Sequence, residues 1–261
     1  MDERIVITIS NANETVTPIE TIDAIHKAGY KHVFVEWYNK DWEISQETQL
    51  EYVRKLGFKI EFAHLGYQGI NNLWLDNEDG EALVKRYQDD LKVCKENGID
   101  LVCMHLTSKS EAPAPNIVGI QRLQKIVNTA EELGIRIGFE NTKIKGYQEY
   151  VLEHIKSDNV GICLDSGHLH AHFNDELNFE LFKDKIFCVH LHDNDGSKDQ
   201  HLIPFEGTID WKWLLDKLKE CNYKGPITLE LVYQNDYVNE DIVEFYKKGL
   251  VAGKRLVELI R

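Results

Sequence analysis

The sequence has no run of about 18 consecutive apolar residues, the length that a membrane-spanning helix requires. It also lacks the hydrophobic core of a signal peptide, because Met1-Asp2-Glu3-Arg4 leads directly into a strand-like run. The five cysteines are odd in number and form no Cys-x-x-Cys pair, as expected of free thiols in a reducing compartment. These absences predict a cytoplasmic protein without a membrane partner.

An excess of basic residues is also absent. The chain has 30 Lys and Arg residues against 44 Asp and Glu residues, its formal net charge is −14 at pH 7, and no basic run stands out. Duplex DNA is held by Lys and Arg along the phosphate path, since counterion release dominates that affinity. The composition therefore weighs against a nucleic-acid partner, although a local basic groove is compatible with it.

Eight apolar runs of strand length recur along the chain, and amphipathic stretches with helical spacing separate them. The predicted strands are residues 5–10, 32–36, 59–64, 101–106, 136–140, 160–165, 186–191 and 227–231. Gly29, Gly57, Gly98 and Gly134 each fall just before the next strand, where a helix C-cap is needed. Strict alternation of strand and helix indicates a parallel sheet with right-handed crossovers.

Eight such units in about 260 residues are typical of a (β/α)8 barrel. We therefore predict the α/β class, with a single (β/α)8 TIM barrel in one domain over residues 1–261. The alternative is a doubly wound open sheet, which typically has a glycine-rich turn after its first strand. Ser10-Asn11-Ala12-Asn13 is not such a turn. Two long connections, 66–79 and 193–210, would lie on the catalytic face of the barrel as lids or substrate walls.

Residues of the types that bind metal ions stand where most of the predicted strands end. They are His64, His105, Glu140, Asp165, His168, His190, Asp199, His201 and Glu230. In a barrel, the carboxyl ends of the strands meet at one mouth, which holds the active site. Taken singly, a strand-end His or Asp is more often a hydrogen-bonded structural group or a helix N-cap. Together, however, several carboxylates in one mouth repel one another, and a divalent cation relieves that repulsion.

Mixed nitrogen and oxygen ligands favour Mn²⁺, Zn²⁺, Co²⁺ or Mg²⁺ over a sulfur-binding ion, and we assign no thiolate ligand to the cysteines. His192 follows His190 by two residues on the same strand face, so it either supports a metal ligand or contacts the substrate. His170 and His172 continue the histidine series and are interpreted as loop or helix-start residues.

Five motifs together are similar to those of a known group of proteins. They are Gly138-Phe139-Glu140-Asn141, Cys163-Leu164-Asp165-Ser166-Gly167-His168, Val189-His190-Leu191-His192-Asp193, the run 199–211 and Gly225-Pro226-Ile227-Thr228-Leu229-Glu230. In order and spacing they resemble the xylose-isomerase-like TIM-barrel superfamily, over essentially the whole chain. That superfamily contains sugar and sugar-phosphate isomerases and epimerases, inosose dehydratase-like enzymes and the endonuclease IV family of DNA-repair enzymes.

The resemblance implies two alternative metal sites. In the epimerase branch one Mn²⁺-type ion is held by residues that correspond to Glu140, Asp165, His190 and Glu230, and His168 would contact the substrate. In the endonuclease branch three zinc ions use these four residues and further ligands. The counterparts of the further ligands are His64, His105, His168, Asp199 and His201. Both ligand sets are complete here, and we expect one ion rather than three.

Two departures from the family pattern concern substrate recognition. The usual Pro-Gly-Glu-Gly motif reads Pro204-Phe205-Glu206-Gly207, which would change the backbone of that loop or fill the pocket. The Arg that epimerases carry after the metal-binding His is absent, and Lys198 is the nearest substitute. No clear phosphate-binding cluster of Gly, Ser and Arg is present, which favours an unphosphorylated substrate.

The resulting hypothesis is a divalent-metal-dependent sugar or sugar-phosphate isomerase or epimerase. The ion would chelate a carbonyl and the adjacent hydroxyl and stabilise an enediolate. Glu140 and Glu230 would remove a proton from one position and return it at another. Substrate contacts are predicted for His168, His105, His64, His192, Lys198 and Trp74, the last of which, or Tyr67, would form an apolar wall for a sugar.

Three alternatives remain open at this point. The same metal site permits dehydration of a keto-polyol or a lyase reaction. The complete ligand set also fits a trinuclear-zinc phosphodiesterase of the endonuclease IV type that cleaves abasic DNA. The third alternative is a barrel that binds a small molecule or partner without catalysis. A homo-oligomer is compatible with the sequence, because Trp37, Tyr38 and Trp42 suit either a pocket wall or a dimer contact.

Overall fold

The computed structural model describes residues 4–9, 16–37 and 45–261, so Tyr38 and Trp42 lie outside the described residues. Eight parallel strands form one sheet in the order β7-β6-β5-β4-β3-β2-β1-β8. They are β1 (Ile5–Thr8), β2 (His32–Trp37), β3 (Lys59–Leu65), β4 (Leu101–His105), β5 (Arg136–Glu140), β6 (Val160–Asp165), β7 (Ile186–His190) and β8 (Ile227–Leu229). The predicted strands and their order are confirmed, with ends that differ by two residues or fewer.

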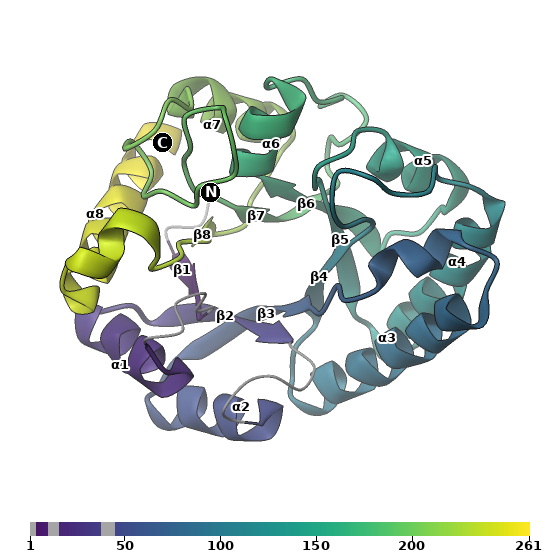
Figure 1. Ribbon diagram of the computed structural model, residues 1–261, viewed down its shortest axis with the longest axis horizontal. Coiled ribbons are helices and arrows are strands. Elements are labelled where there is room, and N and C mark those ends of the chain that lie inside the picture. Colours follow the sequence, from purple (N-terminus) through teal and green to yellow (C-terminus); the bar gives the residue numbers. More distant parts are fainter. Residues whose placement is uncertain (1–3, 10–15, 38–44) are drawn as a thin grey trace.

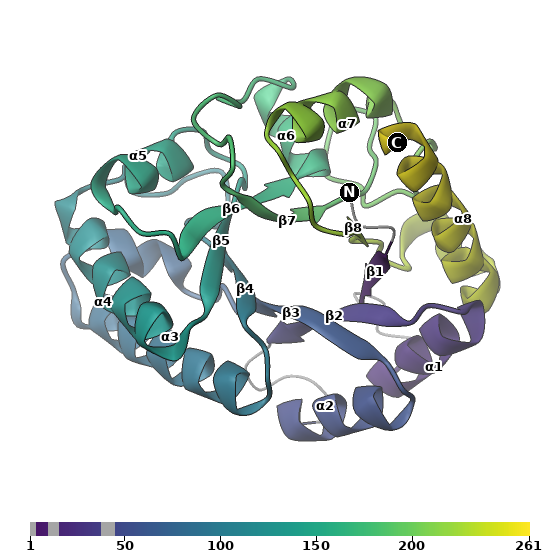
Figure 2. The same ribbon diagram turned by 180° about the vertical axis from the view of Figure 1, so that it is seen from behind.

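The sheet closes on itself into a barrel. β1 pairs in parallel with β8, and on the other edge a single bridge joins Leu191, just after β7, to Leu229. At this point the amide of Leu191 donates to the carbonyl of Thr228 over 2.8 Å. Figure 1 looks along the barrel and shows the strands inside a ring of helices, and Figure 2 shows the same arrangement from behind. The protein is therefore a single (β/α)8 TIM barrel, as predicted.

The helices lie between successive strands. They are α1 (Pro18–Ala28), α2 (Gln46–Lys55), α3 (Glu78–Glu96), α4 (Ile117–Leu133), α5 (Tyr147–His154), α6 (Ser166–Phe173), α7 (Trp211–Glu220) and α8 (Ile242–Ile260), with short 3-10 helices η1 (Ile70–Trp74) and η2 (Asn235–Asn239). Of the four glycines predicted at helix C-caps, Gly29 and Gly134 end α1 and α4 with φ angles of 100° and 66°. Gly57 and Gly98 also have positive φ angles but follow the C-cap residues of α2 and α3, Leu56 and Asn97. No helix in the described ranges has the length and apolarity needed to cross a bilayer.

Side chains along the strands alternate between two apolar layers. The inner layer, inside the barrel, consists of Val6, Phe34, Phe62, Leu101, Cys103, Cys163 and Cys188. Their neighbours along each strand, such as Val33 and Val35 on β2, belong to the larger core between sheet and helices. The rings of Phe34 and Phe62 stack with centroids 4.6 Å apart, so the barrel interior is packed rather than open. This inner layer forms the floor beneath the mouth.

Candidate metal centre at the barrel mouth

Each strand presents one polar side chain at the mouth, two residues beyond an inward-facing residue. In strand order these side chains are Thr8, Glu36, His64, His105, Glu140, Asp165, His190 and Glu230. All of them are buried except His105, which is partly buried. Because side chains alternate with a period of two, the same register that buries the inner apolar layer points all eight toward the barrel axis. Six of them were predicted from the sequence, and Thr8 and Glu36 were missed.

The four residues of the predicted quartet converge on one point. Glu140, Asp165, His190 and Glu230 each offer a ligand atom within 4.8 Å of the others. His190 Nδ1 lies 3.3 Å from Glu140 Oε1, 3.6 Å from Glu230 Oε1 and 4.0 Å from Asp165 Oδ2. Asp165 is also the N-cap of α6, since its Oδ1 accepts a hydrogen bond from the amide of His168 over 2.6 Å. One carboxylate therefore serves both the helix and the cluster.

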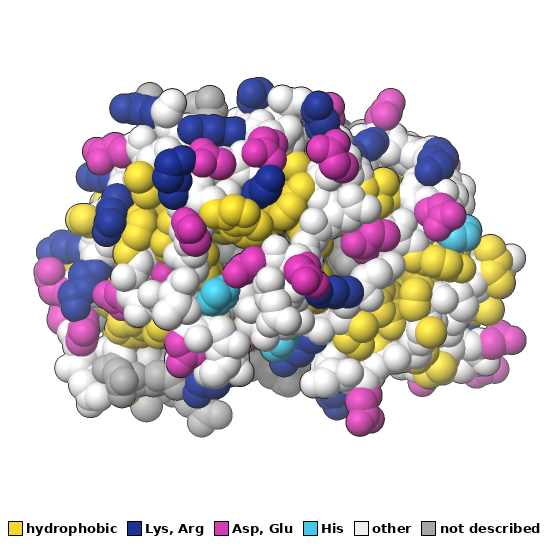
Figure 3. Space-filling model, turned by 90° about the horizontal axis from the view of Figure 1, so that it is seen from above, with side chains coloured by type: hydrophobic (Ala, Val, Ile, Leu, Met, Phe, Trp, Pro, Cys, Tyr) yellow, Lys and Arg dark blue, Asp and Glu magenta, His cyan; other side chains and the backbone are white. Residues whose placement is uncertain are grey.

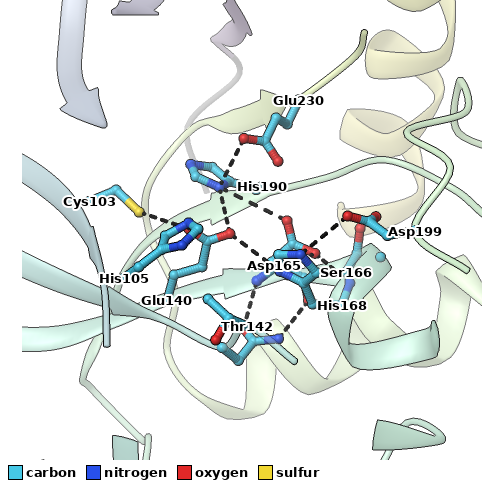
Figure 4. A network of polar contacts seen from close by, with 12 residues as sticks. Cys103, His105, Glu140, Thr142, Asp165, Ser166, His168, His190, Asp199 and Glu230 are labelled. Carbon is cyan, nitrogen blue, oxygen red and sulfur yellow. Dashed lines mark hydrogen bonds and ion pairs between the residues drawn. The ribbon is translucent and has the colours of Figure 1, made fainter. Parts of the chain in front are cut away.

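Glu140 stands at the centre of the polar network (Figure 4). Its Oε2 lies 2.9 Å from His105 Nε2 and 3.2 Å from His64 Nε2, and its Oε1 lies 3.5 Å from His168 Nδ1. Burial alone would raise the pKa of Glu140, but the surrounding imidazoles, His105 foremost, hold that pKa well below its usual range. Glu140 is therefore a fully ionised carboxylate shared among several imidazoles.

Cys103 also belongs to this network, although it was not predicted from the sequence. Its thiol donates to Glu140 Oε2 over 3.3 Å, and its sulfur lies in a second cluster of ligand-type atoms with His64, Glu140 and His190. Burial raises the pKa of the Cys103 thiol. The Cys103 thiol therefore acts here as a donor to Glu140.

Three more of the predicted residues, His168, Asp199 and His201, lie farther out in the pocket, and we call them the outer group. Asp199 Oδ2 lies 3.2 Å from His168 Nε2 and 3.2 Å from His201 Nε2. Burial opposes ionisation of Asp199, but its contacts with His168 and His201 outweigh burial and lower its pKa far below the usual range. His168 joins this outer group to Glu140 through its other ring nitrogen. The nine predicted strand-end residues thus form one continuous network.

The loop that carries Asp199 and His201 is held by Asp193. This fully buried carboxylate accepts hydrogen bonds from the amides of Asn194, Phe205 and Ile209 and from the indole N–H of Trp211, at 2.9 to 3.2 Å. Asp193 also forms an antiparallel bridge with Leu202. Four donors converging on one buried carboxylate fix the loop relative to β7.

Phe205, which stands where the family motif usually has glycine, does not fill the pocket. Phe205 has a φ angle of 78°, the left-handed conformation that glycine adopts most easily, so the backbone suits the glycine usual at this position. The ring lies against the guanidinium of Arg255, 3.7 Å from its centroid, on the outer side of the loop. The substitution therefore neither fills the pocket nor removes the left-handed turn.

His192 lies behind the quartet rather than in the pocket. Its Nε2 is 3.1 Å from Asp165 Oδ2, and its ring stacks on that of His201 with centroids 4.0 Å apart. The ring fits only because residue 167 is glycine, since a Cβ there would lie 1.9 Å from it. Of the two predicted roles for His192, support of a metal ligand matches this position and direct substrate contact does not.

The two glutamates proposed for proton transfer have opposite electrostatic environments. Burial, together with the negative charges of Glu140 and Asp165, raises the pKa of Glu230 well above its usual range. The pKa of Glu140 is shifted in the other direction. Two carboxylates in one cluster that differ in this way suit opposite roles in a proton transfer.

A pocket of about 390 Å³ opens over the cluster, a volume suited to a small molecule. Its lining includes seven predicted residues, namely His64, His105, Glu140, His168, Asp199, His201 and Glu230. It also includes residues that the sequence did not identify, namely Glu36, Thr107, Ser108, Lys109, Thr142, Lys143 and Val232. The two-residue alternation from Phe34 could have revealed Glu36. The others lie in loops, where no periodic signal exists.

Besides His192, two more predicted substrate contacts, Trp74 and Lys198, do not line the pocket. Trp74 is buried between η1 and α4, where its indole N–H donates to the carbonyl of Leu106 over 2.7 Å and its ring occupies the space left by Gly119. Lys198 is exposed on the loop after β7 and does not line the pocket. Tyr67, the other aromatic residue predicted for a sugar wall, does line the pocket and stacks on His105 with centroids 4.3 Å apart.

The donor set fits a divalent ion. Three carboxylates and one imidazole with ligand atoms inside 4.8 Å provide the mixed oxygen and nitrogen coordination that Mn²⁺, Co²⁺ and Zn²⁺ accept. Within the described part of the chain, Asp199 Oδ1 and His168 Nδ1 are buried without a hydrogen-bond partner, as expected of atoms that face an ion. The quartet and the outer group are therefore both suited to metal binding.

Two solved structures share the fold over nearly the whole chain. A D-tagatose 3-epimerase-like protein aligns with a TM-score of 0.74 at 23% sequence identity and covers 98% of each chain. The structure of the IOLI protein with a bound zinc atom aligns with a TM-score of 0.73 at 20% identity, again over 98% of each chain. At these identities the likeness establishes the fold alone.

Similarity in sequence extends to proteins with different descriptions. An uncharacterised protein of Methanocaldococcus jannaschii is 40% identical over 151 residues, 52% of each chain. The inosose isomerase of Bacillus subtilis is 24% identical over 200 residues, 67% of this chain and 70% of the isomerase. A probable endonuclease 4 of Mycoplasma capricolum subsp. capricolum is 25% identical over 190 residues, 64% of each chain. Three uncharacterised relatives are matched over about half of their own length.

The family assignment rests on a longer match. The family described as xylose isomerase-like TIM barrel matches residues 22–249, which include β2 to β8 and all the ligand-type residues of the mouth. The chain therefore belongs to the xylose isomerase-like TIM barrel family.

Proposed function

We propose that this protein is a divalent-metal-dependent isomerase or epimerase of a sugar or related polyol. The observation that carries the proposal is the quartet of Glu140, Asp165, His190 and Glu230, whose ligand atoms lie within 4.8 Å of one another. A sugar-sized pocket with hydrogen-bonding walls opens over it. The sequence similarity to inosose isomerase and the structural likeness to a D-tagatose 3-epimerase-like protein are consistent with this proposal.

The chain's own residues divide the work of a proton transfer. When held by the quartet, a divalent ion supplies Lewis-acid polarisation of a carbonyl and its neighbouring hydroxyl. Glu140 and Glu230 extend from β5 and β8, and one of them removes the proton next to the carbonyl while the other returns it. His105 and His168 line the pocket beside Glu140 and are placed to hydrogen-bond substrate hydroxyls. Tyr67 supplies an aromatic surface beside them.

Replacing either glutamate tests the assignment. Glu140→Gln and Glu230→Gln should each lower turnover by about 100-fold or more, since general acid–base catalysis contributes roughly 10² to 10⁴. The measurement is deuterium exchange from D2O into a panel of ketoses and inososes, with product analysis to separate isomerisation from dehydration. The control is Glu153→Gln, an exposed carboxylate on α5. Near-full exchange in either active-site variant would remove that residue from the acid–base pair.

A second candidate function is supported by the outer group. His168, Asp199 and His201 make a further ligand-type set, and His64 and His105 both contact Glu140, so the protein also fits a three-ion phosphodiesterase. The similarity to a probable endonuclease 4 agrees with this. Against it stands the net charge of −14. Figure 3 shows one side of the barrel, at 90° to the view of Figure 1, where acidic and basic side chains are mixed.

The number of bound ions separates the two candidates. Metal analysis of protein purified without chelator should give about one Mn, Co, Mg or Zn per chain for the isomerase. Three zinc ions per chain together with incision of an abasic-site oligonucleotide would favour the phosphodiesterase. Ketose proton exchange without incision would leave the isomerase proposal standing whatever the metal count.

A further inference from the structure

One rim of the pocket differs in chemistry from the rest. Around most of the mouth the lining consists of carboxylates and imidazoles, but the loops after β4 and β5 contribute only hydroxyl and ammonium groups. These rim residues are Thr107, Ser108, Lys109, Thr142 and Lys143, which we call the basic rim. In a chain with a net charge of −14, the two lysines are the only Lys or Arg residues among the described residues that line this pocket.

The basic rim is built on a fixed scaffold. The hydroxyls of Thr107 and Thr142, both buried, hydrogen-bond to each other over 2.8 Å and tie the two loops together. Asn71 of η1 holds Ser108 from both sides, because its side chain accepts from the Ser108 amide over 2.9 Å and donates to the Ser108 carbonyl over 2.9 Å. These contacts hold the rim in place without using the two ammonium groups.

Lys109 has an unusual backbone conformation for its position. Its φ angle is 67°, in the left-handed region that costs a residue with a side chain about 1 kcal/mol or more. The adjoining Ser108 is anchored on both its amide and its carbonyl, so the surrounding structure maintains this conformation. Backbone strain of this kind is concentrated at ligand-binding positions.

Neither rim lysine forms an ion pair with a carboxylate in the described part of the chain. Across residues 4–9, 16–37 and 45–261, no carboxylate lies within 4.0 Å of Lys109 or Lys143, whereas Lys145, two residues further on, pairs with Glu176 at 2.8 Å. The carboxylates of the pocket are matched mainly with imidazoles, as Glu140 is with His105. Two unpaired ammonium groups beside hydroxyl groups form a recognition surface for an anion.

We infer that the basic rim binds the phosphate group of a phosphorylated ketose whose carbonyl end reaches the quartet. This inference rests on the proposed isomerase function and specifies its substrate class. It reverses the expectation of an unphosphorylated substrate, because the phosphate-binding groups come from two separate loops and form no sequence motif. A phosphomonoester suits the site better than duplex DNA, since among the described residues only two lysines and no arginine line this pocket of about 390 Å³.

Paired ligands provide the test. Binding of D-ribulose 5-phosphate and of D-ribulose to the metal-loaded full chain is measured by calorimetry for the wild type, Lys109→Met, Lys143→Met and the control Lys145→Met. We expect the wild type to bind the phosphorylated sugar at least about tenfold more tightly. Each rim variant should bind that ligand alone roughly tenfold more weakly, which is the loss expected for one charged hydrogen bond. The control should bind it as tightly as the wild type.

Other outcomes would overturn the inference in distinguishable ways. Equal affinity of the wild type for the two sugars would show that the rim is not a phosphate subsite. The isomerase proposal would still hold if proton exchange with ketoses is observed. A phosphate preference that survives both rim variants and disappears with chelator assigns phosphate to the ion instead. If the preference for the phosphorylated sugar depends on the lysines but no proton exchange is observed, the phosphate subsite stands and the isomerase proposal is rejected. If abasic DNA bound through the rim lysines and the sugar phosphate did not, the ligand of the basic rim would be a nucleic acid and not a sugar phosphate.

Discussion

Glu36 is a buried pocket residue that was not predicted from the sequence. It lies buried at the end of β2, lines the pocket, and accepts a hydrogen bond from the hydroxyl of Thr8 over 3.1 Å. Its other oxygen is 3.8 Å from Nδ1 of His64. Among residues 4–9, 16–37 and 45–261, the Glu36 carboxylate thus has one hydroxyl donor and one distant imidazole, so it can accept a hydrogen bond from a substrate hydroxyl.

Substitution of Glu36 should therefore affect substrate binding more than metal binding. We expect Glu36→Gln to raise KM for the ketose about tenfold or more, with metal content unchanged, because the amide replaces one of the two acceptor oxygens with an N–H donor. Thr8→Val serves as the matched control, since it removes only the hydroxyl donor and should have a smaller effect. Unchanged KM in Glu36→Gln would show that this carboxylate does not contact substrate.

At the scale of elements, the loop between β7 and α7 decides the outer part of the site. It carries Asp199 and His201, yet Asp193 at its start holds it in place through four hydrogen bonds. Gly207 permits this arrangement, because a Cβ there would lie 2.3 Å from Asp193 Oδ1. The geometry of the outer group is thus a property of the whole loop rather than of its ligand-type residues.

Loss of the Asp193 carboxylate should release the loop. Asp193→Ala leaves several buried N–H donors without an acceptor, which we expect to lower the free energy of unfolding by on the order of 3 kcal/mol. Chemical denaturation measures that loss, and limited proteolysis reports the loop. Asp195→Ala is the control, since Asp195 is exposed and its carboxylate accepts hydrogen bonds from the amide and the hydroxyl of nearby Ser197. Equal stability of the two variants would contradict the organising role of Asp193.

At the scale of the whole molecule, the mouth gathers charge that the barrel must tolerate. Residues from β2 to β8 contribute to the network, so a bound ion would link strands from around the barrel. Without an ion the carboxylates are balanced by protonated imidazoles. Burial opposes the protonation of His64 and His168, but neighbouring carboxylates, Glu36 and Glu140 for His64 and Asp165 and Asp199 for His168, raise both pKa values well above the usual range. Metal binding must displace those protons.

Metal removal should consequently lower stability, and more so at higher pH. With free ion at about 100-fold over its Kd, binding contributes about 2.7 kcal/mol, which corresponds to a Tm higher by roughly 5 to 10 °C. A raised imidazole pKa stabilises the metal-free fold at low pH and loses that effect as pH rises through the folded pKa. Scanning calorimetry with and without chelator should therefore show a difference that grows from pH 6 to pH 8. A difference that shrinks over that range would contradict this account.

The sequence determined the barrel and its quartet because both depend on local periodicity. Apolar runs separated by amphipathic stretches define strands and helices, and parallel strands bring their ends together whatever the loops do. Glu140, Asp165, His190 and Glu230 could be found in this way because each stands at or just beyond the end of such a run. The same alternation would have identified Glu36, two residues beyond the inward-facing Phe34, had it been applied to β2.

Tertiary structure alone decided the loops, because each loop side chain is placed by partners distant in sequence. Trp74 turns away from the pocket since Gly119, on another helix, leaves room for its ring and Leu106 supplies an acceptor for its N–H. Lys109 and Lys143 meet at one rim since the hydroxyls before them pair across two loops. Such contacts leave no periodic pattern in the sequence. The convergence of Glu140, Asp165, His190 and Glu230 could therefore be predicted, whereas the loop residues that line the pocket could not.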